Sequence, residues 1–335
     1  MQQSIYRSAY KDIRGITLEN ECLKAVFLPE YGGKLASLVY KKTSREFLMQ
    51  AMGTKYKVLR YGESYVNAEC SGFDDMFPTI DRMYYDRDPW RGVEVPDHGE
   101  VCSLPWDYDI QEDCLYMSVH GVRFPYRLEK WIYLHPGKGL RIEYKATNLS
   151  SFDLDFLWAA HPIIDGGDGG EIILPFDGNQ KAICVFSSDN EVIRCGDMLS
   201  WPETVLRNGS RMNLARLEKQ GERKAALKYY FTERLQEGWC AYRCKADGTV
   251  LKMLFPEDVV PYLGILTGED PLTGRLQVFL EPCTGAYDRP DLARLHGQNS
   301  VLSAGEAYSW HLELTVPDES TPLSISGKPG GLMGA

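Results

Sequence analysis

Two histidines and one glutamate stand where acid–base chemistry is favoured. His98 lies in the segment VPDHGEV, His161 follows the aromatic run FLWAA, and Glu281 ends the apolar run VFL. Each emerges at the end of a strand-like run, beside a glycine or a proline, and strand ends and loops on a rigid sheet carry many functional residues. Histidine with a carboxylate is a common pairing for proton transfer near neutral pH. The three residues therefore predict a site of general acid–base catalysis.

Short strand signals dominate the rest of the chain. Several runs alternate polar and apolar residues with a period of two, as antiparallel strands with one face on a core do. Helical patterns are short, near 211–220 and near 288–296, where an aspartate stands at a possible cap and Gly297 at a possible stop. Ten runs rich in β-branched and aromatic residues are predicted strands: 23–29, 34–40, 115–122, 126–134, 140–149, 171–176, 181–186, 250–255, 275–282 and 308–316.

Many short strands, without a βαβ rhythm or an internal repeat, predict an all-β fold, an antiparallel sandwich or barrel. No linker divides the chain, so residues 1–317 are predicted to form a single domain. The segment 186–224 is polar and irregular and is interpreted as an insertion. Residues 318–335 lack a pattern that could join a core, which predicts a flexible C-terminal tail.

The composition limits the classes of partner. The 335-residue chain has a net charge of −10, which attracts neither nucleic acid nor an anionic membrane, so a neutral small molecule is the expected partner. No run approaches the roughly 20 apolar residues of a membrane helix. The N-terminus lacks the apolar core of a signal peptide, and nine cysteines are scattered through apolar runs. We expect a cytoplasmic monomer or homodimer with reduced thiols.

Cys240 and Cys244 have a loosely metal-like spacing in WCAYRCKADG. No second cysteine or histidine pair follows them, so two packed thiols are the stronger interpretation. No metal site is predicted.

The chain resembles the galactose mutarotase-like superfamily, in its aldose 1-epimerase group. The likeness runs from ITLENECLKAVFLPEYGGKLASLVYKKTSREFL at 16–48 to SAGEAYSWHLELTVP at 303–317. A strand pair around Gly-Gly, a His-Gly, a histidine after an aromatic strand and a late Glu-Pro appear in the family's order. The resemblance implies an antiparallel β-supersandwich and an enzyme that interconverts the anomers of a monosaccharide.

The resemblance also implies a role for each of the three residues. Glu281 matches the base that removes a proton from the anomeric hydroxyl, and His161 matches the acid that protonates the ring oxygen. His98 matches the histidine that holds the substrate, and Gly99 is expected to let a sugar approach the backbone. The alternatives are that Glu281 is a solvated glutamate of an edge strand, that His161 is a core histidine and that His98 is a turn histidine. Only protons move in this reaction, so no cofactor is expected.

The chain departs from the family where a sugar-binding arginine is expected. The corresponding stretch reads AECSGFDDMFPTIDR at 68–82, with Asp74 and Asp75 near the position of the arginine. Carboxylates accept hydrogen bonds from sugar hydroxyls, although Gly-Phe-Asp-Asp before proline also suits a turn. Arg82 is a candidate replacement for the missing cation.

The family's later substrate-binding aspartate has no clear match, and Asp165 is a candidate substitute. Trp158 is a candidate to stack on a pyranose ring, although most large aromatics in a β protein are core residues. An aldose 1-epimerase-like isomerase is therefore the main functional hypothesis. The alternatives are a non-catalytic carbohydrate-binding or sensing protein and an isomerase of a modified sugar or sugar phosphate.

Overall fold

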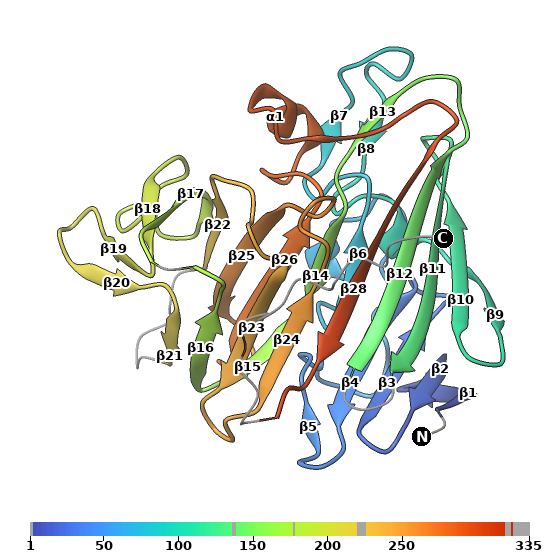
Figure 1. Cartoon of the computed structure of the whole chain (residues 1–335), viewed down its shortest axis with the longest axis horizontal. Coiled ribbons are helices and arrows are strands. Elements are labelled where there is room, and N and C mark those ends of the chain that lie inside the picture. The colour runs from blue at the N-terminus through green and yellow to red at the C-terminus, as the bar shows by residue number, and fades with distance from the viewer. Residues whose placement is uncertain (1–2, 136–138, 177, 220–225, 319–322, 324–335) are drawn as a thin grey trace, which may run out of the picture.

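The structure is a computed structural model that describes residues 3–135, 139–176, 178–219, 226–318 and 323. Strands dominate it, in two large sheets and three two-stranded ones, and the paired strands are antiparallel (Figure 1). The prediction of an all-β, antiparallel fold is confirmed. In the described part of the chain the helical elements are short: α1 (Pro290–Leu295), η1 (Tyr65–Asn67) and η2 (Val101–Ser103).

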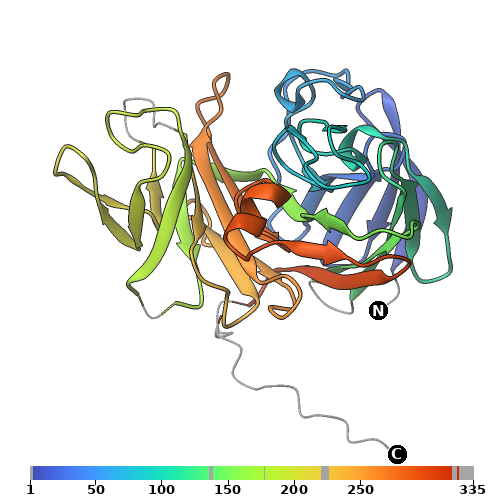
Figure 2. The same ribbon diagram turned by 90° about the horizontal axis from the view of Figure 1, so that it is seen from above.

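The larger sheet, called the site sheet below, has its N-terminal strands and strands β17 and β18 at opposite ends of the molecule (Figure 2). Its spatial order is β1 (Ser4–Tyr10), β2 (Ile13–Glu19), β3 (Leu23–Leu28), β4 (Lys34–Tyr40), β6 (Phe73–Met76), β14 (Ala159–Pro162), β26 (Leu276–Cys283), β25 (Tyr262–Glu269), β22 (Leu227–Phe231), β17 (Gln180–Ser187) and β18 (Met198–Trp201), with β5 (Arg45–Glu46) on β4 and β15 (Ile164–Gly167) on β26.

The second sheet, called the outer sheet below, places β28, β12 and β11 across the front of Figure 1. Its order is β21 (Arg216–Glu218), β16 (Gly169–Ile173), β23 (Trp239–Cys244), β24 (Val250–Leu254), β28 (Ala307–Thr315), β12 (Gly139–Asn148), β11 (Tyr126–His135), β10 (Leu115–His120) and β9 (Asp107–Ile110). The small sheets pair β13 (Leu154–Phe156) with β27 (Ser300–Leu302), β19 (Glu203–Val205) with β20 (Arg211–Asn213), and β7 (Met83–Tyr84) with β8 (Glu94–Val95).

Period-two alternation decides which side chains enter the main core. In β12, Leu140, Ile142 and Tyr144 are buried in the main hydrophobic cluster, while the residues between them are only half-buried. In the site sheet, Val278 and Leu280 of β26 join the same cluster. Because successive residues of a strand point to opposite faces, the residues between them must face the other side of the site sheet.

The central strands of the site sheet are buried on that other face as well. Every residue of β6 and β14 is buried. A second hydrophobic cluster there joins Met76, Ala159 and Tyr230 of the sheet to Tyr65 and Ile80 of the connecting segments. The segments between β5 and η2 therefore cover the middle of the sheet, and polar groups beneath them are shielded from water.

Each of the ten predicted strand runs contains a strand, and the helix predicted near 288–296 is α1. The helix predicted near 211–220 is wrong, because that stretch holds β20 and β21. The Asn213 side chain accepts the N–H groups of Ala215 at 2.9 Å and Arg216 at 2.8 Å, a local turn that competes with a helix. The predicted irregular insertion at 186–224 likewise contains strands β18 to β21.

The division into a domain over 1–317 and a tail over 318–335 stays a prediction, since 319–322 and 324–335 lie outside the described residues. In the described part of the chain, no helix is long and apolar enough to span a membrane.

Candidate active site

Glu281, His161 and His98 meet on the covered face of the site sheet. Glu281 comes from β26 and His161 from the adjacent strand β14, and the distance from His161 Nε2 to Glu281 Oε1 is 3.8 Å. His98 lies in the segment between β8 and η2, and its ring centroid is 5.2 Å from that of His161, with the rings perpendicular. Three segments far apart in the sequence thus place two imidazoles and a carboxylate together.

A cavity of about 1000 Å³ opens over these residues. His98 and His161 line it, together with Lys228 of β22, Asp81 and Asp288. Glu281 has no exposed surface and lies directly beneath the lining, next to His161 and Lys228. The cavity therefore has a charged floor that contains cationic, anionic and imidazole groups.

Lys228 links Glu281 to a second carboxylate. Its ammonium lies 2.7 Å from Glu281 Oε2 and 2.8 Å from Asp288 Oδ1, and the Tyr230 hydroxyl donates to Asp288 at 2.5 Å. Burial alone lowers the pKa of Lys228, but the Asp288 and Glu281 carboxylates outweigh burial and raise it. Lys228 is therefore a permanent buried cation shared between two carboxylates.

Glu281 is poised for contact with a ligand. Burial raises its pKa, and the neighbouring charge of Lys228 opposes that rise. Its Oε2 lies 2.7 Å from the Lys228 ammonium, whereas its Oε1 has no hydrogen-bond partner among the described residues. Buried polar atoms without such partners are uncommon and require an explanation, of which a ligand is one.

His161 is neutral at neutral pH. Its pKa lies well below the usual histidine range because it is buried and because His98, Lys228 and Lys34 bring positive charge nearby. Its Nδ1 is buried and has no hydrogen-bond partner among the described residues. In a neutral imidazole one ring nitrogen donates a hydrogen bond and the other accepts one. It lacks the second N–H proton that an imidazolium releases as a general acid.

His98 is held on three sides. Its φ of 62° lies in the left-handed region, and its Nδ1 is 2.9 Å from Asp97 Oδ1. The Tyr65 ring stacks on it with centroids 4.2 Å apart, and the Tyr65 N–H donates to Asp97 Oδ2 at 2.8 Å. Burial alone raises the pKa of Asp97, but the hydrogen bond and charge of His98 prevail and lower it. The Asp97 carboxylate and the Tyr65 ring therefore fix the orientation of the His98 ring.

Asp74 binds the hydroxyl group of Tyr65. It is buried, it accepts a hydrogen bond from the Tyr65 hydroxyl at 2.7 Å, and Lys34 Nζ lies 3.0 Å from its Oδ2. It is paired with His161 in the β6–β14 register and therefore faces the site. Asp74 does not line the cavity, so its position makes it a support for Tyr65 and, through the stacked rings, for His98.

Asp75 and Trp158 lie on the opposite side, in the main core, which corrects the expectation that they bind substrate. Asp75 accepts the Trp158 indole N–H at 3.0 Å and pairs with Lys130 of β11 at 2.8 Å. Trp158 is fully buried against Tyr144 and Trp310 of the outer sheet. Neighbouring residues of a strand face opposite ways, so Asp74 and Asp75 cannot both face the site.

Arg82 and Asp165 are not brought to the cavity lining either, which corrects the expectation for both. Arg82 is exposed and forms an ion pair with Glu94. Asp165 lies on β15, and its carboxylate binds the Arg275 guanidinium at 2.8 Å and 2.6 Å. A carboxylate already engaged by a bidentate arginine is poorly placed to accept sugar hydroxyls as well.

Gly99 is needed for packing against protein rather than against a sugar. It forms a bridge with Phe77, its φ is 77°, and an added Cβ would lie 2.3 Å from the Phe77 carbonyl oxygen. We expect Gly99→Ala to lower the free energy of unfolding by more than the ~1 kcal/mol of a left-handed alanine alone. Gly92→Ala is the control for urea unfolding, since Gly92 has φ 85° and open space around it. Equal losses in the two variants would contradict the packing role.

Lys228, Asp288, Tyr65 and Asp97 are site residues that were not expected from the sequence. The alternation in LKYYF is a signal for Lys228, because Leu227, Tyr229 and Phe231 share the core face and leave Lys228 on the other. The helix α1 has no side-chain cap, and Asp288, which precedes it, pairs with Lys228.

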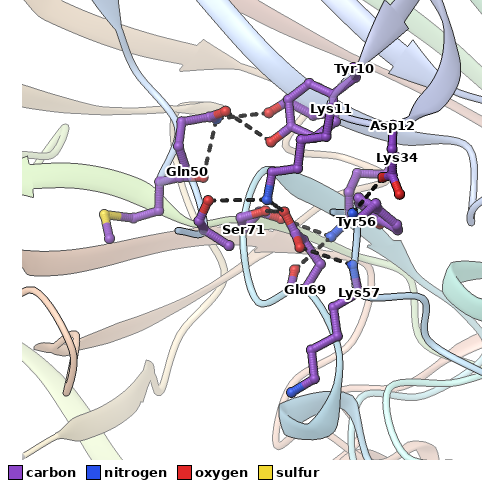
Figure 3. Close-up of polar contacts among 12 residues, drawn as sticks. Tyr10, Lys11, Asp12, Lys34, Gln50, Tyr56, Lys57, Glu69 and Ser71 are labelled. Carbon is purple, nitrogen blue, oxygen red and sulfur yellow. Dashed lines mark hydrogen bonds and ion pairs between the residues drawn. The ribbon is translucent and has the colours of Figure 1, made fainter. Parts of the chain in front are cut away.

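A polar network fixes the segment that forms one wall of the cavity (Figure 3). The buried Glu69 carboxylate pairs with Lys11 of the N-terminal hairpin and accepts the Lys57 N–H at 3.1 Å. Lys34 donates to the carbonyl oxygens of Glu69 at 3.1 Å and Ser71 at 2.8 Å. These contacts tie residues 57–71, including Tyr65, to the rigid end of the site sheet.

Comparison with known proteins matches residues 2–89 to DUF5107, a domain of unknown function. No curated protein matches the sequence. A galactose mutarotase-like protein from Lactobacillus casei has a similar structure, with TM-score 0.65 and 20% identity over 90% of this chain and 100% of that one. A putative aldose 1-epimerase from Escherichia coli follows, with TM-score 0.60 and 16% identity over 94% and 99%. The GalM/aldose epimerase homologue from C. elegans has TM-score 0.58 and 15% identity over 94% and 99%.

The chain thus has the galactose mutarotase-like fold, an antiparallel β-sandwich, which confirms at the level of fold the resemblance stated from the sequence. At these identities the similarity establishes the fold alone, and the activity has to be argued from the site.

Proposed function

We propose that this protein is a cofactor-independent isomerase that interconverts the anomers of a monosaccharide, with Glu281, His161 and His98 as its acid–base groups. The observation that carries the proposal is the convergence of these residues at the floor of one cavity, with His161 Nε2 only 3.8 Å from Glu281 Oε1. The buried Glu281 Oε1 and His161 Nδ1, which have no hydrogen-bond partner among the described residues, add support.

The reaction needs one base and one acid. The base removes the proton of the anomeric hydroxyl while the acid gives a proton to the ring oxygen, and the bond between the anomeric carbon and the ring oxygen breaks. The open aldehyde then rotates about its bond to the adjacent carbon and closes from the other face as both protons return. Ring opening and closing are therefore balanced by proton transfer alone.

Glu281 is proposed as the base, and Lys228 as the cation that moves aside to expose it. Glu281 is fully buried, so a sugar hydroxyl reaches it only when the Lys228 ammonium moves off Oε2. Lys228 also contacts Asp288 at 2.8 Å, so it can leave Glu281 and keep an ion pair. Retaining one carboxylate partner avoids the large cost of an unpaired buried charge.

The two histidines are proposed to divide the remaining tasks differently from the assignment that the resemblance implied. His98 is oriented by its contact with Asp97 and lines the cavity, so it is proposed as the acid. His161 is neutral, so it suits a hydrogen-bond donor to the developing charge, a role that neutral imidazoles fill elsewhere. The sequence-based assignment, with His161 as the acid, is the competing one.

A carbohydrate-binding or sensing protein without turnover is the second candidate function. The full burial of Glu281 under Lys228 favours it, because a base that cannot reach the anomeric hydroxyl supports binding but no exchange. The cavity and its charged floor suit either candidate.

Anomer exchange tests the choice. Saturation transfer between the two anomeric protons is measured over aldoses, deoxy sugars, uronates and sugar phosphates, with Glu281→Gln as the control. Acceleration of one sugar that disappears in the variant supports the isomerase. Shifts on binding without acceleration support the binding protein, and neither effect across the panel contradicts both.

Asp97→Asn tests the role of His98. We expect the exchange rate to fall about tenfold, because the carboxylate that holds His98 Nδ1 at 2.9 Å is replaced by an amide that holds the ring less firmly. Ser64→Ala is the control, since it removes a 3.2 Å contact to Asp97 and keeps the carboxylate. An unchanged exchange rate in Asp97→Asn would assign the acid to another residue.

A further inference from the structure

Four large apolar side chains border the cavity and remain exposed to solvent. They are Met52 (71% exposed), Val66 (72%), Phe186 (50%) and Leu272 (81%). Met52 and Val66 belong to the connecting segments after β5, Phe186 to β17 and Leu272 to the turn between β25 and β26. Scattered apolar residues on a surface need no explanation, but a group from separate segments around one hollow indicates a binding site.

Buried apolar residues, called the apolar wall below, also line the cavity beside the candidate site. Met49, Ile163 and Phe279 form a separate buried cluster with Cys70 and Leu266 packed against it, and these residues line the cavity. The Phe279 ring lies 5.0 Å from that of His161. The cavity therefore has apolar lining both beside the candidate site and at its exposed rim.

Polar residues line the cavity at the candidate site. They include Tyr65, Asp81, His98, Lys228 and Asp288, so the cavity is amphipathic rather than uniformly sugar-like. Its volume of about 1000 Å³ is at the upper end of the roughly 300–1,000 Å³ found for pockets that hold drug-sized molecules. A single hexose is much smaller and would leave the apolar wall and rim in contact with water, which is unfavourable.

We propose that the preferred substrate is a reducing sugar that carries an apolar substituent. The sugar lies against the polar residues of the candidate site, and the substituent lies against the rim of Met52, Val66, Phe186 and Leu272. This inference rests on the proposed function, because exchange needs a free anomeric hydroxyl. The substituent must therefore be attached away from the anomeric carbon. Apolar residues line the same cavity at His161 and at the rim, which favours a ligand that spans floor and rim over a protein docked on the rim alone.

The test compares the binding of hexoses with that of their 6-O-hexanoyl esters, whose reducing end is free. Calorimetry with the wild-type protein is expected to give about tenfold tighter binding for the ester of the accepted hexose, since burial of each methylene is favourable. The double variant Phe186→Ser, Leu272→Ser is expected to lose most of that preference and to keep its affinity for the free hexose. Both side chains are exposed, so the fold is expected to persist.

The matched control is the double variant Phe152→Ser, Leu295→Ser, which removes side chains of equal type and exposure (51% and 77%) that do not line the cavity. It is expected to keep the preference for the ester. Equal or weaker binding of the ester by the wild-type protein, while the hexose still binds, would overturn this inference alone. Binding of neither compound would overturn the proposed function as well. Self-association that the rim variant abolishes, without preference for the ester, would assign the rim to a second copy of the chain and overturn the inference.

Discussion

Replacing Lys228 by methionine is expected to lower the free energy of unfolding by about 3–5 kcal/mol, the usual cost of removing one partner from a buried ion pair. Lys228 is the cation between Glu281 and Asp288, and its side chain is only 7% exposed. Without it, the two buried carboxylates of Glu281 and Asp288 lose the cation that they share. Denaturant unfolding at neutral pH measures the loss.

The pH dependence of that loss identifies its cause. Burial already raises the pKa of Glu281 above 4.5, and Lys228 is the charge that opposes the rise, so the variant raises it further. A carboxyl group whose pKa is higher in the folded state binds more protons there, so stability falls as pH rises from about 4.5 to the folded pKa. The deficit of Lys228→Met is therefore expected to be small near pH 4.5 and to grow toward neutrality.

Lys252→Met is the matched control. Lys252 is also buried, but it has no ion pair with a carboxylate among the described residues, and its ammonium lies 4.7 Å from the centre of the Trp239 ring. We expect a smaller loss in that variant and no growth of the loss with pH. A deficit in Lys228→Met that is independent of pH would contradict the proposed charge cluster.

Replacing Glu281 by glutamine is expected to slow anomer exchange by about 10²–10⁴-fold, the range that general acid–base groups contribute. The amide has nearly the same shape but accepts a proton far more weakly, so sugar binding is expected to persist. Lys228 keeps Asp288 as its partner, so the folded state is expected to survive the change. Exchange rates and sugar affinity are measured on the same samples.

The control for this variant is Glu129→Gln. Glu129 is a buried carboxylate of β11 that accepts a hydrogen bond from Tyr116 at 2.7 Å and does not line the cavity. The Glu129→Gln variant is expected to leave the rate of anomer exchange unchanged. Full activity in Glu281→Gln would move the base to another group, of which Asp288 is the nearest carboxylate on the cavity wall.

The strands were predictable because their signal is local. A period of two in apolar residues, as in β11 and β12, follows directly from the pleat of a half-buried strand. The helix predicted at 211–220 is wrong because the turn at Asn213, the hairpin pairing of β20 with β19 and the pairing of β21 with the distant strand β16 decide the conformation. Local pattern carries no information on such pairing.

The site was predictable only in part. The resemblance pointed to Glu281, His161 and His98, which the fold brings together. Asp74 and Asp75 are neighbours in β6 and point to opposite faces of the site sheet. Which of them points to the candidate site depends on which face of β6 meets the outer sheet. The Lys228 cluster depends on strands β22 and β26 meeting through β25, a neighbour relation that the sequence does not display.

The most direct measurement is NMR saturation transfer between the anomeric protons of each sugar in the panel, with wild-type protein and with Glu281→Gln at equal concentration. We expect at least one sugar whose anomers exchange faster with the wild-type protein and at the uncatalysed rate with the variant. Exchange at the uncatalysed rate for every sugar, with resonance shifts that report binding, would contradict an isomerase and leave a carbohydrate-binding protein.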